Sequence, residues 1–274
     1  MPNPISPDLV QTQVDAILQS KKYRQMGIPE STLRDIVTEE LGNYRSSKDA
    51  QKSVRHKLHT IMAPYLGDPD YDAEQARLQQ LPQNTSMEDM RACCTPILMA
   101  HASTRERLPM LNRFYEGIFA HTGRPAAILD LACGLNPFAL PWMGLDREIK
   151  YYAYDIHQPR VDLINTLLLK LGLEPLAKVT DILLEPPEIE ADVAFLFKEA
   201  HRLEQRRRGC NLPLWKALKV RHLLVSLPSS SLSGQHDLAE RQRHLVRTII
   251  GDQPWHVDEM IFDTEMVFCI EKNG

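Results

Sequence analysis

Two patterns of apolar positions divide the chain near residue 100. Before that point, apolar residues recur every three or four positions, as in Leu9–Leu18, Leu33–Leu41 and Val54–Met62, and this spacing is typical of amphipathic helices. Ser31 is the expected N-cap of the second of these helices. We therefore predict a helical domain over residues 1–100 and a domain of different type over residues 101–274.

The second domain is predicted to be an α/β sheet. The apolar runs that predict its strands are Ala127–Leu131, Lys150–Tyr154, Ala177–Thr180, Val193–Phe197, His222–Leu227, Val257–Phe262 and Met266–Ile270. Helix-compatible segments at Pro109–His121, Pro159–Leu171 and Leu238–Ile250 alternate with them, which favours a doubly wound, mostly parallel sheet of Rossmann-like type. Because no helix separates the last two of the seven strands, they are expected to form an antiparallel hairpin at one edge.

Composition narrows the class of protein. The chain has 274 residues, 43% of them hydrophobic and 25% charged, which excludes collagen-like and fully disordered proteins. It has no apolar run of the ~18 residues that a membrane span needs, and no basic segment followed by an apolar one at its start. Its five cysteines show no C-x-x-C spacing, so neither a disulfide framework nor a metal site is expected. These features predict a cytoplasmic protein without a membrane partner.

Charge is segregated along the chain, although the net charge is only −4. Residues 198–222 include eight lysines and arginines but only two acidic residues. Residues 20–60 include nine lysines and arginines and five acidic residues. Two basic faces on a mildly acidic protein could bind a polyanion locally. Solvated helix faces explain the same pattern, and charge alone leaves both interpretations open.

The segment Ile128–Pro137 carries the strongest signal for a ligand. It places Asp130 in an apolar strand, followed by a small-residue turn at Gly134, and the next strand ends in Asp155, 21 residues after Gly134. In open α/β sheets ligands bind beyond the carboxyl ends of the strands, and an acid about 20 residues after the glycine turn suits ribose hydroxyls. Asp181 and Ile182 after the third strand would suit an adenine amine and ring.

The same segment argues against a dinucleotide cofactor. It lacks a full G-x-G-x-x-G, so little is present to cradle a pyrophosphate. S-adenosylmethionine has no phosphates and needs a ribose-binding acid, an adenine slot and a site for its amino-acid end, so this set favours it. Taken singly, Gly134 could be only a turn glycine and Asp155 only a helix-capping acid.

The segment Ser103–Pro109 has two interpretations. Ser103 and Glu106 have the spacing of a capping box, a purely structural device. Pro109 instead restricts Leu108 and favours a turn from which two arginines project. One of them could then pair bidentately with a cofactor carboxylate, and the other could meet a phosphate.

The residues Ser103–Pro109, Asp130–Pro137 and Pro141–Leu145 closely resemble motifs of the Arm/Rmt-type aminoglycoside-resistance 16S ribosomal RNA methyltransferases. The resemblance covers the whole domain after residue 100 and, more weakly, the N-terminal helices. It implies a class I methyltransferase that uses S-adenosylmethionine to methylate N7 of one decoding-site guanine in the small ribosomal subunit. It also implies that the helical domain docks on 16S rRNA.

The resemblance assigns residues to the cofactor site. Arg107 would hold the cofactor carboxylate, Asp155 the ribose, and Asp181 with Ile182 the adenine. The remaining implied cofactor contacts are Tyr65, His101, Ala102, Ser103, Ala132, Gly134 and Phe197.

The implied chemistry needs no catalytic acid or base. Guanine N7 carries an in-plane lone pair and no proton, so only proximity and orientation are required. The target base must leave its stack, and Leu227 and Pro228 are placed to line its pocket. Glu265 could accept hydrogen bonds from guanine N1–H and the exocyclic amine, although a solvent-exposed edge glutamate fits its position as well.

Phosphate contacts are expected from the basic clusters. The candidates are Lys21, Lys22, Arg24, Lys52, Arg55, Lys57, Arg105, Arg202, Arg206, Arg207 and Arg208. Family members often have Gln at the position of Arg206 and Lys or Arg at that of Ser230. The arginine run could therefore supply the cation that Ser230 lacks.

Two other functions stay open. The chain could methylate another rRNA base, or it could be a homologue that binds RNA or the ribosome without turnover. A small-molecule methyltransferase would have no evident use for the basic helical domain. We expect the protein to act as a monomer.

Overall fold

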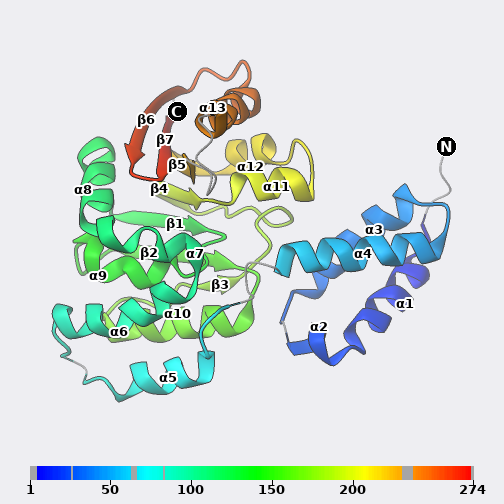
Figure 1. Cartoon of the computed structure of the whole chain (residues 1–274), viewed down its shortest axis with the longest axis horizontal. Helices are drawn as coiled ribbons and strands as arrows, with labels where there is room; N and C mark the ends of the chain where they lie inside the picture. The colour runs from blue at the N-terminus through cyan, green and yellow to red at the C-terminus, as the bar shows by residue number, and fades with distance from the viewer. Residues whose placement is uncertain (1–4, 26, 63–66, 83, 230–236, 273–274) are drawn as a thin grey trace.

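One sheet organises the larger part of the protein (Figure 1). The computed structural model describes residues 5–25, 27–62, 67–82, 84–229 and 237–272. In that part of the chain, the strands are β1 (Ala127–Leu131), β2 (Lys150–Asp155), β3 (Lys178–Val179), β4 (Glu190–Phe197), β5 (Lys219–Pro228), β6 (His256–Phe262) and β7 (Glu265–Glu271). Their order is β3-β2-β1-β4-β5-β7-β6, so the predicted doubly wound sheet of seven strands is confirmed.

The last two strands form the predicted antiparallel hairpin. β1 to β5 pair in parallel, whereas β7 runs antiparallel to both β5 and β6. β6 is the edge strand, and β7 lies inside the sheet between β5 and β6. The third strand is shorter than predicted, because only Lys178 and Val179 pair with β2.

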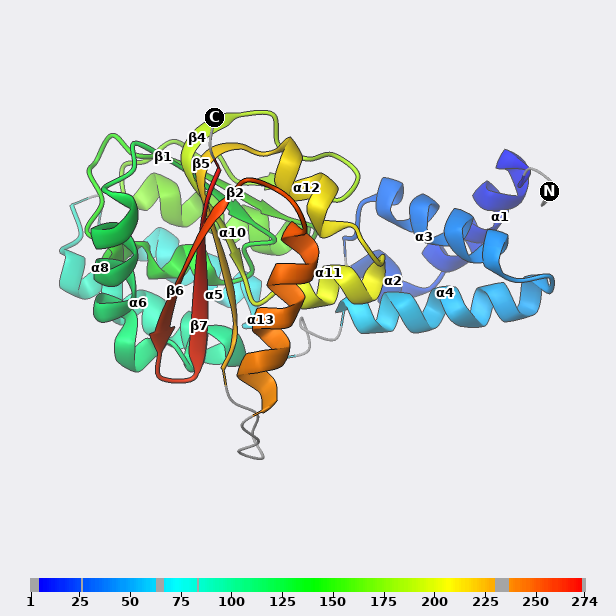
Figure 2. The ribbon, with the colours of Figure 1, turned by 90° about the horizontal axis from the view of Figure 1, so that it is seen from above.

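Helices cover both faces of the sheet, as Figure 2 shows from above. Their bounds are α6 (Met87–Ala100), α8 (Leu111–Thr122), α9 (Leu140–Met143) and α10 (Gln158–Lys170) on one face, and α11 (Ala200–Arg206), α12 (Asn211–Ala217) and α13 (Asp237–Ile250) on the other. On the first face Phe114 and Leu167 are fully buried, and on the second Trp215 is. The two apolar layers hold the strand ends in fixed positions.

The N-terminal helices have a hydrophobic core of their own and project from the sheet domain (Figure 2). These helices are α1 (Pro7–Leu18), α2 (Lys21–Gln25), α3 (Glu30–Asn43) and α4 (Ser47–Met62). Val14, Leu33, Ile36 and Leu58 are buried among them. The helix predicted to begin after Ser31 begins at Glu30, with Pro29 at its N-cap.

The two cores divide earlier than residue 100. Helix α5 (Tyr71–Gln80) and helix α6 belong to the sheet domain. Their side chains Leu78, Met90 and Ile97 are fully buried in the core on one face of the sheet. Both helices precede residue 100, the predicted domain boundary, and an amphipathic helix has the same sequence pattern whichever domain covers its apolar face.

The segment after α6 contains a single helical turn, α7 (Ala102–Arg105), and a 3₁₀ turn, η2 (Leu108–Met110). His101 caps α7, because its Nδ1 accepts a hydrogen bond from the Ser103 amide at 3.3 Å. Of the two interpretations of this segment, the capping box of Ser103 and Glu106 does not form, because His101 is the N-cap and Ser103 lies inside α7. Glu106 instead pairs with Lys198, which follows β4.

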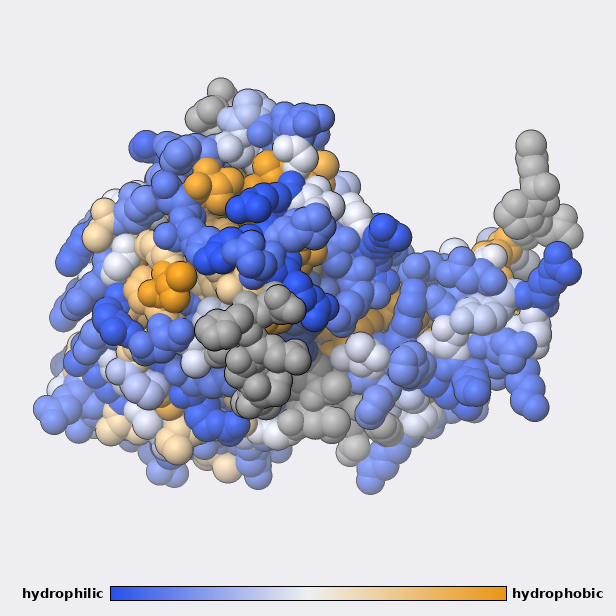
Figure 3. Space-filling model, turned by 45° about the horizontal axis from the view of Figure 1, so that its top comes forward, coloured by the Kyte–Doolittle hydropathy of each residue, from blue (hydrophilic) through white to orange (hydrophobic). Residues whose placement is uncertain are grey.

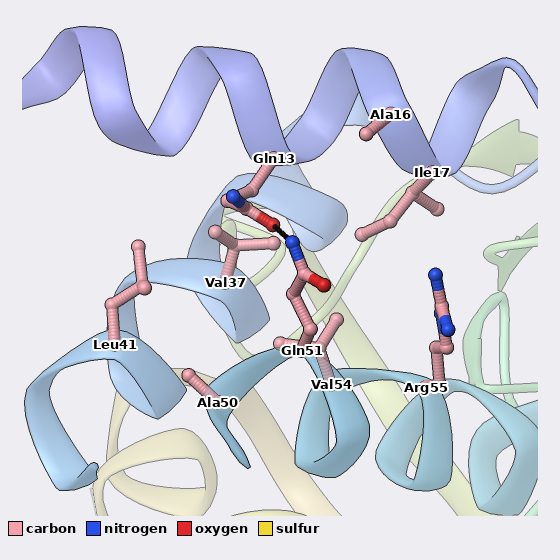
Figure 4. Close-up of a pocket in the computed structure, with 9 residues that line it drawn as sticks. All are labelled: Gln13, Ala16, Ile17, Val37, Leu41, Ala50, Gln51, Val54 and Arg55. Atoms are coloured by element: carbon pink, nitrogen blue, oxygen red, sulfur yellow. Dashed lines mark hydrogen bonds between the residues drawn. The ribbon is translucent and has the colours of Figure 1, made fainter. Parts of the chain in front are cut away.

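A small cavity lies among the N-terminal helices (Figure 4). Its volume is about 20 Å³, and its lining includes Val37, Leu41 and Val54. A hydrogen bond of 2.5 Å between Gln13 and Gln51 crosses it. Space of this size holds about one water molecule, so the cavity is a packing defect and not a ligand site.

The face of the molecule seen in Figure 3 is largely hydrophilic, and the apolar patches visible on it are small and separated. None of the helices in the described residues is both long and apolar enough to span a membrane.

Candidate functional site

The carboxyl ends of β1, β2 and β4 bring most of the predicted cofactor residues to one edge of the sheet. Ala132 and Gly134 follow β1, Asp155 ends β2, and Phe197 ends β4. Arg107 arrives from the turn between α7 and η2. Ligands of open α/β sheets bind at the carboxyl ends of the parallel strands, and the topology places these residues together there.

The turn after β1 is shaped by two residues in the left-handed region. Ala132 has φ 48° and Gly134 has φ 55°, a conformation that costs little only for glycine. The Gly134 amide donates a hydrogen bond to Asp155 Oδ2 at 3.1 Å. Asp155 Oδ1 accepts from the His157 amide at 2.9 Å. Asp155 thus holds both the glycine turn and the start of α10, next to where a ribose would lie.

Arg160 is part of this site, although no sequence motif predicted it. Its Nη1 lies 2.9 Å from Asp155 Oδ2. Its Nη2 lies 2.8 and 2.7 Å from the two carboxylate oxygens of Asp68. All three side chains are buried. Asp68 precedes α5 in the chain, and no motif connects it with α10.

The Arg107 side chain is held by contacts with two aromatic rings and by three hydrogen bonds. Its guanidinium carbon lies 4.4 Å from the ring centre of Phe114 and 4.7 Å from that of Phe197. Its Nε and Nη2 donate to Glu265 at 3.2 and 2.5 Å, and its Nη1 donates to Asn136 Oδ1 at 2.7 Å. The side chain is therefore held in one orientation, and its role toward a cofactor carboxylate stays a prediction.

Glu265 is fully buried, so the solvent-exposed edge glutamate considered above is excluded. It pairs in register with Pro228 of β5, beside the pocket predicted for the base. Burial raises the pKa of Glu265, but Arg107 and Lys198 together lower it below its ordinary value. The Lys198 ammonium lies 3.4 Å from Glu265. Lys198 has φ 59°, a strained conformation that places its side chain at the end of β4.

Asp130 is a buried acid without a matching cation. Its Oδ2 accepts from Asn136 at 2.9 Å and from the Tyr151 hydroxyl at 2.5 Å. Its Oδ1 has no hydrogen-bond partner among the described residues. Burial raises the pKa of Asp130 to about 7, and the bonds from Asn136 and Tyr151 offset only part of this shift.

This shift predicts a pH-dependent stability. Asp130 keeps its proton up to about pH 7 in the native state but loses it near pH 4 when unfolded, so the folded state is progressively destabilised as pH rises between these values. Replacing Asp130 with asparagine should remove this pH dependence. The free energy of unfolding of the variant minus that of wild type should therefore rise by up to about 4 kcal/mol from about pH 4 to about pH 7. Urea denaturation over this pH range measures the difference, and a difference that does not change with pH would contradict the prediction.

Asp181 and Ile182 follow β3, and both are buried. The carboxylate of Asp181 is held by the Arg206 guanidinium, with distances of 2.9 and 2.5 Å. It also accepts from the Thr32 hydroxyl at 2.9 Å. The predicted adenine acid therefore already has partners, one of them in the N-terminal helices.

Several predicted phosphate contacts have acidic partners instead. Arg206 is largely buried between Asp181 and Asp35, and Arg207 lies 2.6 Å from both oxygens of Asp35. Lys57 pairs with buried Glu40 at 2.6 Å. Within the arginine run predicted to supply the cation missing at Ser230, the charges of Arg206 and Arg207 are therefore paired inside the protein, and Arg208 is exposed.

Other predicted cations remain accessible. The exposed residues among them are Lys21, Arg24, Lys52, Arg55, Arg105 and Arg208. Arg202 is half-buried and lies 3.7 Å from Glu199. Tyr65, Ser230 and the side chain of Lys22 lie outside the described residues.

The remaining predicted residues lie at the same edge. His101 Nδ1 is 2.7 Å from the Ser103 hydroxyl, and Ala102 is exposed beside them. Leu227 is fully buried near the end of β5. No group of three or more potential metal ligands occurs within the described part of the chain.

The strand order with its inserted antiparallel β7, and the acid and glycine turn at the strand ends, define a class I methyltransferase. The profile of a family described as "Ribosomal RNA methyltransferase (FmrO)" matches residues 19–269. The chain belongs to this family of ribosomal RNA methyltransferases.

Individual relatives agree along the whole chain. The 16S rRNA (guanine(1405)-N(7))-methyltransferase of Serratia marcescens is 33% identical over 262 residues, which cover 94% of this chain and 97% of that protein. An enzyme of the same name from Micromonospora echinospora is 30% identical over 270 residues, 97% of each chain. The crystal structure of the 16S rRNA methyltransferase RmtF in complex with S-adenosyl-L-homocysteine is 30% identical, with a TM-score of 0.79, and the match covers 98% of this chain and 100% of that one.

The residues of this chain fit such a cofactor. Arg107 offers a guanidinium to a carboxylate, and Ile182 offers an apolar side chain to an adenine. The left-handed turn at Gly134 brings a bare backbone next to Asp155. The charged groups Arg107, Asp155 and Asp181, however, already form ion pairs with other residues of the protein. A bound cofactor must therefore share these groups with their present partners or replace the partners.

Proposed function

We propose that the protein transfers a methyl group from S-adenosylmethionine to N7 of a decoding-site guanine in 16S rRNA of the small ribosomal subunit, and thereby confers aminoglycoside resistance. The observation that carries this proposal is the buried Arg107, packed against Phe114 and Phe197, at the same end of the sheet as the Gly134–Asp155 turn. Its relatives with this named activity match nearly the full chain.

The cofactor would be held by residues from several elements. Arg107 binds its carboxylate, with His101, Ala102 and Ser103 around the amino-acid end. Asp155 binds the ribose, Asp181 and Ile182 the adenine, and Ala132, Gly134 and Phe197 line the pocket. Because these groups lie at the ends of buried strands, they orient the cofactor without large motion.

Methyl transfer then depends on orientation. When bound, S-adenosylmethionine supplies an activated methyl group, and guanine N7 needs no deprotonation to accept it. Leu227 and Pro228 would line the pocket of the flipped base, with Glu265 beside it. This division of labour explains why no nucleophile or general base is required.

The N-terminal helices would bind the RNA. Exposed lysines and arginines on α2 and α4 supply phosphate contacts, so affinity should fall steeply with salt. Action on the assembled ribosome implies a cytoplasmic protein. The proposed docking surface and the proposed cofactor site belong to one chain, so we propose that the protein acts as a monomer.

The deciding experiment is transfer of labelled methyl to intact small subunits, beside naked 16S rRNA. The product is mapped by chain cleavage specific for N7-methylguanine. Cleavage at the decoding-site guanine is the expected result. Label elsewhere would assign another base, and no label with normal cofactor binding would leave a ribosome-binding homologue without turnover.

Removing two exposed cations of α4 should weaken RNA binding without affecting the cofactor site. For Lys52→Ala with Arg55→Ala, the slope of log affinity against log salt should become shallower by about one for each phosphate that is no longer bound. Filter binding to small subunits over a salt series measures this slope. Arg221→Ala removes an exposed cation at the start of β5, far from the N-terminal helices, and should leave the slope unchanged. Equal slopes for all three proteins would refute the docking role of α4.

A further inference from the structure

All acceptor positions of the Asp181 carboxylate are in use. Oδ1 accepts from the Leu183 amide at 3.2 Å and from Arg206 Nη1 at 2.9 Å. Oδ2 accepts from Thr32 Oγ1 at 2.9 Å and from Arg206 Nη2 at 2.5 Å. A carboxylate offers about four such positions, so a further donor, such as an adenine amine, can bind only by replacing one of these.

Two of the partners connect this acid with the N-terminal helices. Thr32 lies on α3 and is fully buried. Arg206 also lies 3.6 Å from Asp35 of the same helix, and neighbouring Arg207 bonds to both oxygens of Asp35. In Figures 1 and 2, α11 is the helix of the sheet domain that lies beside the N-terminal helices. The predicted adenine acid is thus part of a contact between the two domains.

We propose that Thr32 and Arg206 are positioning residues of the cofactor site, and that the N-terminal domain and the adenine amine compete for Asp181. This inference rests on the proposed function and extends it. Cofactor binding would thereby change how firmly α3 is held against the sheet domain.

Of the partners of Asp181, Thr32 is the one that we expect the adenine amine to replace. Its bond to Asp181 is a single bond from a neutral hydroxyl, whereas Arg206 makes a bidentate, charge-assisted pair, which is stronger. When the adenine amine takes the place of Thr32, Asp35 and Arg207 still join the domains. Coupling of this kind is reciprocal, so any change that removes Thr32 from Asp181 must tighten cofactor binding.

The test uses the full-length protein without RNA and S-adenosylhomocysteine as the ligand, with calorimetry as the readout. For Thr32→Val, which keeps the shape and removes the hydroxyl, the dissociation constant should fall roughly fivefold, the lower end of common couplings. Thr32→Ser keeps the donor and is the matched control, expected within about twofold of wild type. Asp35→Asn weakens the same domain contact without touching Asp181 and should also tighten binding.

Hydrogen exchange gives a second readout on the wild-type protein. The amides of α3 should exchange faster when S-adenosylhomocysteine is bound, because the helix is then no longer hydrogen-bonded to Asp181. If Thr32→Val does not fold, Asp35→Asn and this exchange experiment decide the question.

Different results would overturn the competition for Asp181 and the proposed methyltransferase function. Unchanged or weaker binding by Thr32→Val and Asp35→Asn, with no change in α3 exchange, would overturn the competition but leave the methyltransferase function standing. Absence of S-adenosylhomocysteine binding by wild type would instead overturn the proposed function itself.

Discussion

Replacing Glu265 with alanine should destabilise the protein by about 3–5 kcal/mol, the cost of removing one partner from a buried ion pair. The variant leaves the buried Arg107 guanidinium, which packs against two phenylalanine rings, without its bidentate carboxylate partner. Because Arg107 then loses its fixed orientation, affinity for S-adenosylmethionine should fall as well. Urea denaturation and calorimetry measure the two effects.

The same strand provides the control. Glu271, at the other end of β7, pairs with exposed Arg221 at 3.0 Å, so Glu271→Ala should cost less than about 1 kcal/mol. Glu265→Gln keeps a hydrogen-bond acceptor but removes the charge, and it distinguishes two roles of Glu265, positioning of Arg107 and contact with guanine. A raised KM for the cofactor with normal turnover at saturation indicates that Glu265 only positions Arg107, whereas abolished turnover at saturation indicates contact with guanine. Full activity of Glu265→Ala on small subunits would eliminate both roles.

Arg160→Met should destabilise the protein about as much as Glu265→Ala. The methionine retains apolar bulk but leaves the buried carboxylates of Asp68 and Asp155 without their shared cation. We expect a loss of about 3–5 kcal/mol in the free energy of unfolding, measured by urea denaturation.

A second substitution tests this explanation. Arg160→Met combined with Asp68→Asn removes one of the two orphaned charges, so the double variant should recover part of the missing stability. Arg113→Met breaks an exposed pair with Asp263 and should change stability by less than about 1 kcal/mol. Additive losses in the double variant would show that Asp68 and Arg160 are not coupled.

The sheet could be predicted because its signal is local. Each strand is a short apolar run, and the missing helix before Met266–Ile270 was enough to indicate the antiparallel hairpin. The glycine turn and Asp155 were also predictable, because one βαβ unit fixes their distance in the chain. The start of the sheet domain was not, because α5 and α6 have the same amphipathic pattern as the helices before them.

The partners of the charged site residues could not be predicted from the sequence. Glu265 is 158 positions from Arg107, and Thr32 is 149 positions from Asp181. No spacing rule spans such separations, so Arg206 and Arg207 looked like free cations. A signal was present for Asp130, because an acid inside an apolar strand must find a polar partner when it is buried.

β7 is an inner strand of the sheet, and this has a consequence for the order of folding. It must enter between β5 and β6, and it brings Glu265, the partner that fixes Arg107. A folding intermediate in which β7 is not yet paired can contain the N-terminal helices and the parallel strands but not this ion pair. The Arg107 side of the site is therefore completed only when the antiparallel hairpin has joined the parallel sheet.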